Sequence, residues 1–212
     1  MRRPFFRRPS VLLAIIAVLA VFGWSLYRAS TAVHVHHFPG PALTNPKDLK
    51  PRKSMLNVGQ KAPNFAISGL NGQSYRLADH RGRPILLEFF ADWCPHCQSE
   101  APIIQRLVGA YKSRGIIFWS ILASPYGPNF DNSFGQDTTL ASAGDLRYFS
   151  RTYKEHIPQL VGKHFTVVNE YGVNSYPGIY IVNKRGIISY AQSGDQSFTQ
   201  LDDAIGKALA GK

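Results

Sequence analysis

The sequence predicts an α/β domain, and three neighbouring features support this fold class. The two cysteines of the chain, Cys94 and Cys97, are separated by two residues. A run of six mostly apolar residues, ILLEFF at positions 85–90, precedes them, and a segment with apolar residues at helical spacing follows. Strand, turn and helix in this order are the context in which a Cys-x-x-C pair is typical of redox chemistry rather than of metal binding. At a helix start, the two sulfurs lie within bonding distance and can alternate between dithiol and disulfide.

The basic charge of the chain is concentrated near its N-terminus. The 212 residues carry a net charge of +11, and 44% of them are apolar, enough to supply a core. Residues 1–53 hold nine Lys and Arg against one acid, Asp48, so most of the excess lies outside the predicted domain. No basic stripe with interleaved aromatic residues follows, and we therefore expect no nucleic-acid partner.

The first residues predict a membrane anchor. A basic stretch, residues 1–10, precedes an uncharged apolar run over residues 11–27. That run spans about 26 Å as a helix, near the lower limit for crossing a bilayer, and the preceding arginines orient the N-terminus to the cytoplasm. A cleaved signal peptide, with Ser30 and Ala32 at the cleavage site, is the alternative. Both predict a catalytic domain on the extracytoplasmic, periplasmic side, where a membrane redox partner must maintain the cysteine pair.

A linker and one domain follow the anchor. Residues 28–56 are rich in Pro, His, Lys and Thr without a period, and we interpret them as an extracytoplasmic linker, with a metal-binding histidine tract as the alternative. Residues 57–212 form the predicted domain. It opens with a β-hairpin turning at Asn71-Gly72, before the strand at 85–90. A helix kinked by Pro102 runs from the cysteines to Arg114, and a buried strand spans 116–123.

The second half of the domain begins with a long loop at 124–139, for which the sequence predicts no role. Ser142 and Asp145 predict a capping box. The helix that it opens would extend through Ile157 and end at Pro158. A second hairpin, 179–183 with 187–190, and an amphipathic helix lined by Leu201, Ile205 and Leu209 complete the order hairpin, β, α, β, α, β, β, α.

This order, with Trp-Cys-x-x-Cys after the first buried strand, resembles the thioredoxin fold, a central mixed β-sheet flanked by helices, here with an N-terminal β-hairpin extension. The segment VGQKAPNF at 58–65 and the predicted anchor make residues 58–210 similar to the membrane-anchored TlpA/ResA/DsbE-like branch. The resemblance places the family's helix-kinking proline at Pro102, its buried acid at Glu88 and its cis-proline at Pro177. Two departures concern Pro95-His96, which resembles strongly oxidising DsbA-type enzymes, and Tyr176, where the family has a small or β-branched residue.

The predicted chemistry divides between the two thiols. At a helix N-terminus, backbone N–H groups and the helix dipole lower a cysteine pKa from about 8.5 to roughly 3.5–7.5, so Cys94 is the predicted nucleophile. Cys97, one turn later, would resolve the mixed disulfide. Glu88 interrupts a buried strand, which predicts a raised pKa and a proton relay to or from Cys97, the alternative being a carboxylate that reaches solvent.

Four further residues are candidates for contact with substrate: Trp93, Pro95, His96 and Tyr176. A protonated His96 would stabilise the Cys94 thiolate, and a solvent-facing side chain of little effect is the alternative. A cis Tyr176–Pro177 bond would present the backbone of residue 176 to a substrate strand. Trp93 is also a candidate packing residue.

These features predict a thiol–disulfide oxidoreductase acting on protein thiols and disulfides, without cofactor or metal. The family resemblance favours a reductase for the maturation of cytochrome c or metalloproteins, and Pro95-His96 favours a DsbA-like thiol oxidase. A third alternative is a copper-binding chaperone module, because two thiolates and a histidine suit Cu(I).

Overall fold

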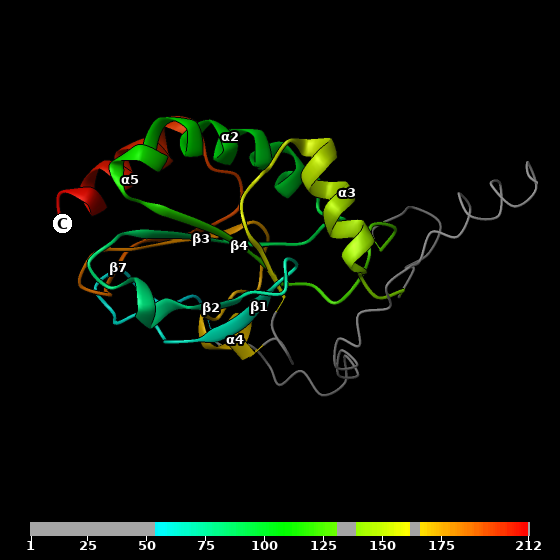
Figure 1. Ribbon diagram of the computed structural model, residues 1–212, viewed down its shortest axis with the longest axis horizontal. Coiled ribbons are helices and arrows are strands. Elements are labelled where there is room, and N and C mark those ends of the chain that lie inside the picture. The colour runs from blue at the N-terminus through cyan, green and yellow to red at the C-terminus, as the bar shows by residue number, and fades with distance from the viewer. Residues whose placement is uncertain (1–53, 131–138, 162–165, 212) are drawn as a thin grey trace, which may run out of the picture. The chain divides into compact units, whose positions relative to one another are not determined.

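The computed structural model describes residues 54–130, 139–161 and 166–211 (Figure 1). The predicted basic N-terminus (1–10), the predicted membrane anchor (11–27) and almost all of the predicted linker therefore lie outside the described residues. Within the three described ranges, no helix is long and apolar enough to cross a membrane.

One mixed sheet of seven strands, in the order β2-β1-β5-β4-β3-β6-β7, organises the domain. Strands β3, β4 and β5 run parallel, whereas β6 and β7 on one side, and β1 and β2 on the other, pair antiparallel. The central β3 is buried along its whole length, as its apolar sequence predicts. The bounds of the strands are β1 Ala66–Gly69, β2 Ser74–Arg76, β3 Ile85–Phe90, β4 Ile117–Leu122, β5 Gln159–Val161, β6 Gly178–Val182 and β7 Ile188–Ser193.

Helices cover both faces of this sheet. Helices α2 (Pro95–Tyr111) and α5 (Phe198–Leu209) lie side by side on one face, and α4 (Thr166–Glu170) lies on the other (Figure 1). Two short 3₁₀ turns, Leu77–His80 and Lys112–Arg114, follow β2 and α2. Alternate side chains of β3 enter different cores, because Leu86 packs with α2 and α5 whereas Leu87 and Phe89 pack towards α4. The thioredoxin-like mixed sheet predicted from the sequence is confirmed.

The predicted helix after the long loop is wrong at its end. Helix α3 (Ala143–Tyr153) begins with the predicted capping box, in which Ser142 accepts from the Asp145 N–H and the Asp145 carboxylate accepts from the Ser142 N–H. It ends at Tyr153 because Lys154 adopts a left-handed conformation, with φ of 59°. Ile157 and Pro158 instead lead into β5. Neither β5, of three residues, nor α4, of five, was predicted, since elements so short carry no measurable periodicity.

Candidate active site

The cysteine pair occupies the first turn of α2. Cys94 is the N-cap residue, with extended backbone angles, and Pro95 takes the first helical position, where a missing N–H costs nothing. Both thiols are free, and the side chains of Cys94 and Cys97 are 4% and 0% exposed. The Cys94 sulfur lies 3.7 Å from the carbonyl oxygen of Tyr176, to which its protonated form donates. Of the two cysteines, only Cys94 keeps any exposed surface.

The environment separates the acidities of the two thiols, as the sequence predicts. A hydrogen bond from the Cys97 thiol lowers the pKa of Cys94 to about 6 against the effect of burial, with smaller contributions from the N–H groups of Cys97 and His96 and the charge of His96. Burial, followed by the neighbouring Cys94, raises the pKa of Cys97. At neutral pH, Cys94 is a thiolate and Cys97 holds its proton. This division suits a nucleophile followed by a resolving thiol.

Glu88 lies beneath the cysteines in the middle of β3. Its side chain is 0% exposed, so the alternative that it reaches solvent is wrong. Burial raises the pKa of Glu88 to about 7, although the Ser120 hydroxyl, which donates to Oε2 over 2.7 Å, lowers it. The charge of Cys94 is among the causes of this shift, which couples the carboxyl to the redox centre. Glu88 is therefore a buried base whose protonation changes near neutral pH.

Three further buried acids were not recognised in the sequence. Glu100, three residues after Cys97 on the same face of α2, is 2% exposed and accepts from the Gln196 N–H over 3.0 Å, and burial raises its pKa to about 9. Burial raises the pKa of Asp92 to about 7. Glu155, between α3 and β5, is 0% exposed. The i+3 spacing from Cys97 was the available signal for Glu100. Glu155 offered none, because it follows the end of a helix that was predicted to continue.

The cis-proline loop lies against Cys94. The Tyr176–Pro177 peptide bond is cis, as predicted, and the Pro177 carbonyl accepts from the Gly194 N–H over 2.9 Å. The Tyr176 hydroxyl donates to the carbonyl of Ala123 at the end of β4 over 2.7 Å. This bond fixes the large side chain that replaces the family's small residue, and turns its ring towards Trp93.

An aromatic group borders the cysteines. The ring of Trp93 lies 5.0 Å from Phe130 and 6.0 Å from Tyr176, and Phe130 stacks on Tyr126 at 4.2 Å. The Trp93 indole N–H donates to the Ser124 hydroxyl over 2.8 Å. All four rings are half-buried. The described part of the loop predicted at 124–139 therefore borders the redox centre through two aromatic side chains, a placement that the sequence did not predict.

His96 points away from the aromatic group, to an acid on the β7–α5 connection. Its Nδ1 lies 2.9 Å from Oδ2 of Asp195, and the two side chains are 64% and 63% exposed. The negative charge of Asp195 offsets part of the stabilisation that a protonated His96 gives to the Cys94 thiolate. In the described ranges, no three or more His, Cys, Asp and Glu side chains are grouped to hold a metal ion.

The comparisons with known proteins agree with this geometry. The family model described as AhpC/TSA matches residues 58–191. The chain belongs to the AhpC/TSA family. The ResA thiol-disulfide oxidoreductase of Bacillus thuringiensis is 25% identical over 156 residues, covering 74% of this chain and 81% of that protein. The thioredoxin-like protein YneN of Bacillus subtilis is 25% identical over 191 residues, covering 90% and 92%.

Solved structures share the fold. DsbF of MTB, in mixed oxidised and reduced forms, superposes with a TM-score of 0.56 at 22% identity, over 68% of this chain and 94% of that one. A thiol:disulfide interchange protein of Chlorobium tepidum gives 0.54 at 20% identity, over 76% and 99%. The curated relatives confirm the predicted resemblance to ResA-like proteins. The chain is a thiol–disulfide oxidoreductase.

Proposed function

We propose that the chain is a membrane-anchored, extracytoplasmic oxidoreductase that reduces disulfides of protein substrates in the maturation of cytochrome c or metalloproteins. The pKa of Cys94, which its environment lowers to about 6, supports this direction. In thioredoxin, an electron donor, the equivalent thiol has a pKa of about 7, and in the oxidant DsbA about 3.5. A stabilised thiolate makes a disulfide more oxidising, and the thiolate of Cys94 is only moderately stabilised.

Each chemical step has a group to carry it. The Cys94 thiolate attacks one sulfur of the substrate disulfide, and the other substrate sulfur leaves as a thiolate that takes a proton from solvent. Cys97 gives its proton to Glu88 and attacks the Cys94 sulfur, which forms the Cys94–Cys97 disulfide and releases the second substrate thiolate. Substrate gains two electrons, and the chain loses two. A membrane redox partner returns the two electrons, and one proton re-forms the Cys97 thiol while Cys94 returns to the thiolate.

The surface around Cys94 supports a polypeptide substrate. A substrate cysteine that reaches the 4% exposed Cys94 must pass the half-buried rings of Trp93 and Tyr176. Aromatic rings offer apolar contact area at low entropic cost, which favours an unfolded segment with apolar residues beside its cysteine. Pro95 and His96 lie between the two cysteines in the chain, and Pro177 follows Tyr176, whose carbonyl oxygen contacts the Cys94 sulfur. This arrangement agrees with substrate contact at the four predicted residues.

The reduction potential of the Cys94–Cys97 pair tests the proposed direction. The full chain is equilibrated in glutathione redox buffers, and the fraction of disulfide is measured by thiol labelling and mass spectrometry. We expect a potential near that of thioredoxin, roughly −270 mV. A value near that of DsbA, roughly −120 mV, would favour the thiol oxidase instead. If the chain were instead a copper chaperone, it would retain one equivalent of Cu(I) in the presence of a competing chelator.

Replacing Asp195 by Asn should make the pair more oxidising. Without the carboxylate 2.9 Å from His96 Nδ1, a protonated His96 stabilises the Cys94 thiolate more strongly. Exposed charge pairs amount to roughly 0.2–1 kcal/mol, so the pKa of Cys94 should fall by less than about one unit. A thiolate absorbance titration measures the shift. The control is the double variant His96→Asn with Asp195→Asn, in which the fall in the pKa of Cys94 should disappear. A higher pKa of Cys94 in the Asp195→Asn variant would contradict the prediction.

A further inference from the structure

Two buried carboxyls with too few donors lie on the same side of the sheet as α2. Glu88 of β3 and Glu155 before β5 are both 0% exposed. In the register of the sheet, Glu88 is opposite Ser120 of β4, and Ser120 is opposite Gln159 of β5. Opposite residues of neighbouring strands project to one face, so the side chains of Glu88, Ser120 and Gln159 form a row on that face.

Hydrogen-bond donors for this pair are scarce. The Ser120 hydroxyl donates to Oε2 of Glu88 over 2.7 Å and has only one proton. Among the described residues, Oε1 of Glu88 and both carboxyl oxygens of Glu155 have no donor. A buried carboxylate without donors is costly, and two adjacent ones more so. A proton on one carboxyl converts an acceptor into a donor, and the other carboxyl can then accept.

We propose that Glu88 and Glu155 form a pair that shares one proton, held on Glu155, and that Glu155 thereby keeps Glu88 a base for the Cys97 proton. Glu155 is then a positioning residue, since it acts on Cys97 through Glu88. At rest the pair carries one negative charge. When Cys97 attacks Cys94, its proton moves to Glu88 and both carboxyls are neutral until one proton leaves. The inference rests on the proposed function, because it assigns a role in the resolving step.

The acidities agree with this placement of the proton. Burial, and then the charge of Glu88, raise the pKa of Glu155 well above its usual range. A hydrogen bond with Glu155 is one of the interactions that lower the pKa of Glu88. The groups that face the pair are Cys94 at the N-cap of α2, Cys97 and Glu100 from α2, Ser120 from β4 and Gln159 from β5.

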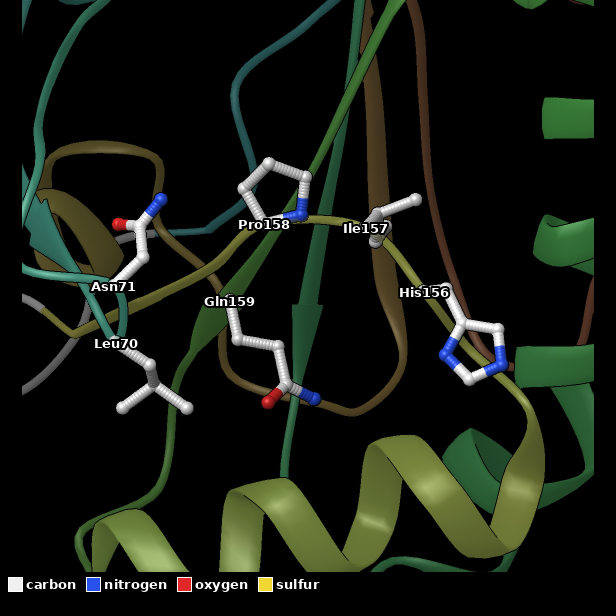
Figure 2. A pocket seen from close by; sticks show the side chains of 6 residues that line it. All are labelled: Leu70, Asn71, His156, Ile157, Pro158 and Gln159. Carbon is white, nitrogen blue, oxygen red and sulfur yellow. The ribbon is translucent and has the colours of Figure 1, made fainter.

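A cavity lies beside the segment that follows Glu155. It has a volume of about 350 Å³ and is lined by the residues that follow Glu155, from His156 to Gln159, together with Leu70 and Asn71. Figure 2 shows the side chains of His156 and Gln159 on the side of the segment that faces α3, whereas Pro158 and Asn71 point the other way. The cavity therefore begins at the residue that follows Glu155 in the chain.

Two substitutions of Glu155 separate the donor from the bulk of the side chain. Glu155→Gln keeps an N–H donor for Glu88, so the resolving rate should stay within about twofold of the original and its pH profile should not move. Glu155→Leu removes the donor and raises the pKa of Glu88. A rise of one unit from about 7 leaves about a tenth of Glu88 ionised at pH 7 instead of half, which slows resolution about fivefold and moves the profile to higher pH. Equal rates for Leu and Gln would overturn the proposal.

A spectroscopic readout makes the test independent of exchange activity and of the Leu variant's folding. The infrared carbonyl stretch of protonated carboxyls is recorded for the full chain at pH 8, and the difference from Glu155→Gln is taken. We expect the band of one protonated carboxyl to disappear in Glu155→Gln. In Glu88→Gln this band should remain, because the proton is held on Glu155. An unchanged band in Glu155→Gln would overturn the proposal even if exchange is normal. A chain that shows the band but exchanges no disulfides would refute the proposed function alone.

Discussion

Replacing Cys94 by Ser abolishes disulfide exchange, whereas replacing Cys97 by Ser leaves the first attack intact and traps the mixed disulfide. The pKa of Cys94, about 6, makes this thiol the nucleophile at neutral pH, and a serine hydroxyl does not ionise there. We expect Cys94→Ser to lose more than about a thousandfold in turnover, on the scale seen when other enzymes lose their nucleophile. Cys97→Ser loses turnover too, but after the first covalent step.

Mass spectrometry separates the two outcomes. Each variant is mixed with a disulfide-linked model peptide, and the covalent adduct is quantified before and after addition of a reducing agent. The adduct should form on Cys97→Ser and not on Cys94→Ser. The double variant is the control for reaction elsewhere, since the chain has no third cysteine. Turnover retained by Cys94→Ser, or an adduct on the Cys97 sulfur, would remove Cys94 from its assigned role.

The features predicted correctly from the sequence are those encoded locally. The Cys94–Cys97 spacing, the apolar run around Glu88 and the capping box at Ser142 each depend on neighbours within a few residues. The strand that they predict for residues 85–90 is the central β3, and its apolar neighbours explain why Glu88 is buried. The cis bond before Pro177 was predicted from the family resemblance, which places the cis-proline just before an apolar strand.

The features that were missed depend on contacts between distant segments. His96 meets Asp195 across 99 positions of the chain, and Trp93 meets Ser124 across 31. Neither pairing has a local pattern, so the partial neutralisation of His96 and the aromatic group could not be predicted. Glu155 was missed because its burial follows from the end of α3 at Lys154, a single left-handed residue in a sequence whose apolar period continues to Ile157.

Replacing Glu88 by Gln slows resolution and removes a pH dependence of stability. Without a base, Cys97 must lose its proton to solvent from a buried site, and general base catalysis typically contributes about 10²–10⁴-fold. We therefore expect the mixed disulfide to persist at least about a hundredfold longer in Glu88→Gln, while the first attack by Cys94 is nearly unchanged. Stopped-flow mixing with a model disulfide, followed by acid quenching, measures the two steps separately.

The stability change has a definite sign. The pKa of Glu88 is 4.5 in the unfolded chain and about 7 in the folded one, so between these values the folded state binds more protons than the unfolded state. Stability then falls as pH rises from 4.5 through 7, and the loss is complete above the folded pKa. At 1.36 kcal/mol per pKa unit, Glu88 costs about 3 kcal/mol at pH 8, a large part of the stability of an ordinary domain.

Urea unfolding of the dithiol form, followed by tryptophan fluorescence, measures this cost at pH 4 and pH 8. The stability of Glu88→Gln relative to the original chain should rise by about 3 kcal/mol between the two pH values. Glu100→Gln is the comparison variant, because Glu100 is also buried but its pKa of about 9 keeps it protonated in the folded chain up to pH 8 while the unfolded chain loses that proton. Its relative stability should therefore rise by more than that of Glu88→Gln, by about 5 kcal/mol between the two pH values. Glu88 lowers the stability of the folded chain, but it gives the redox centre a base that changes protonation near neutral pH, where Cys97 must lose its proton. Equal slopes for both variants would show that Glu88 does not titrate in this range and cannot take the proton of Cys97 at neutral pH.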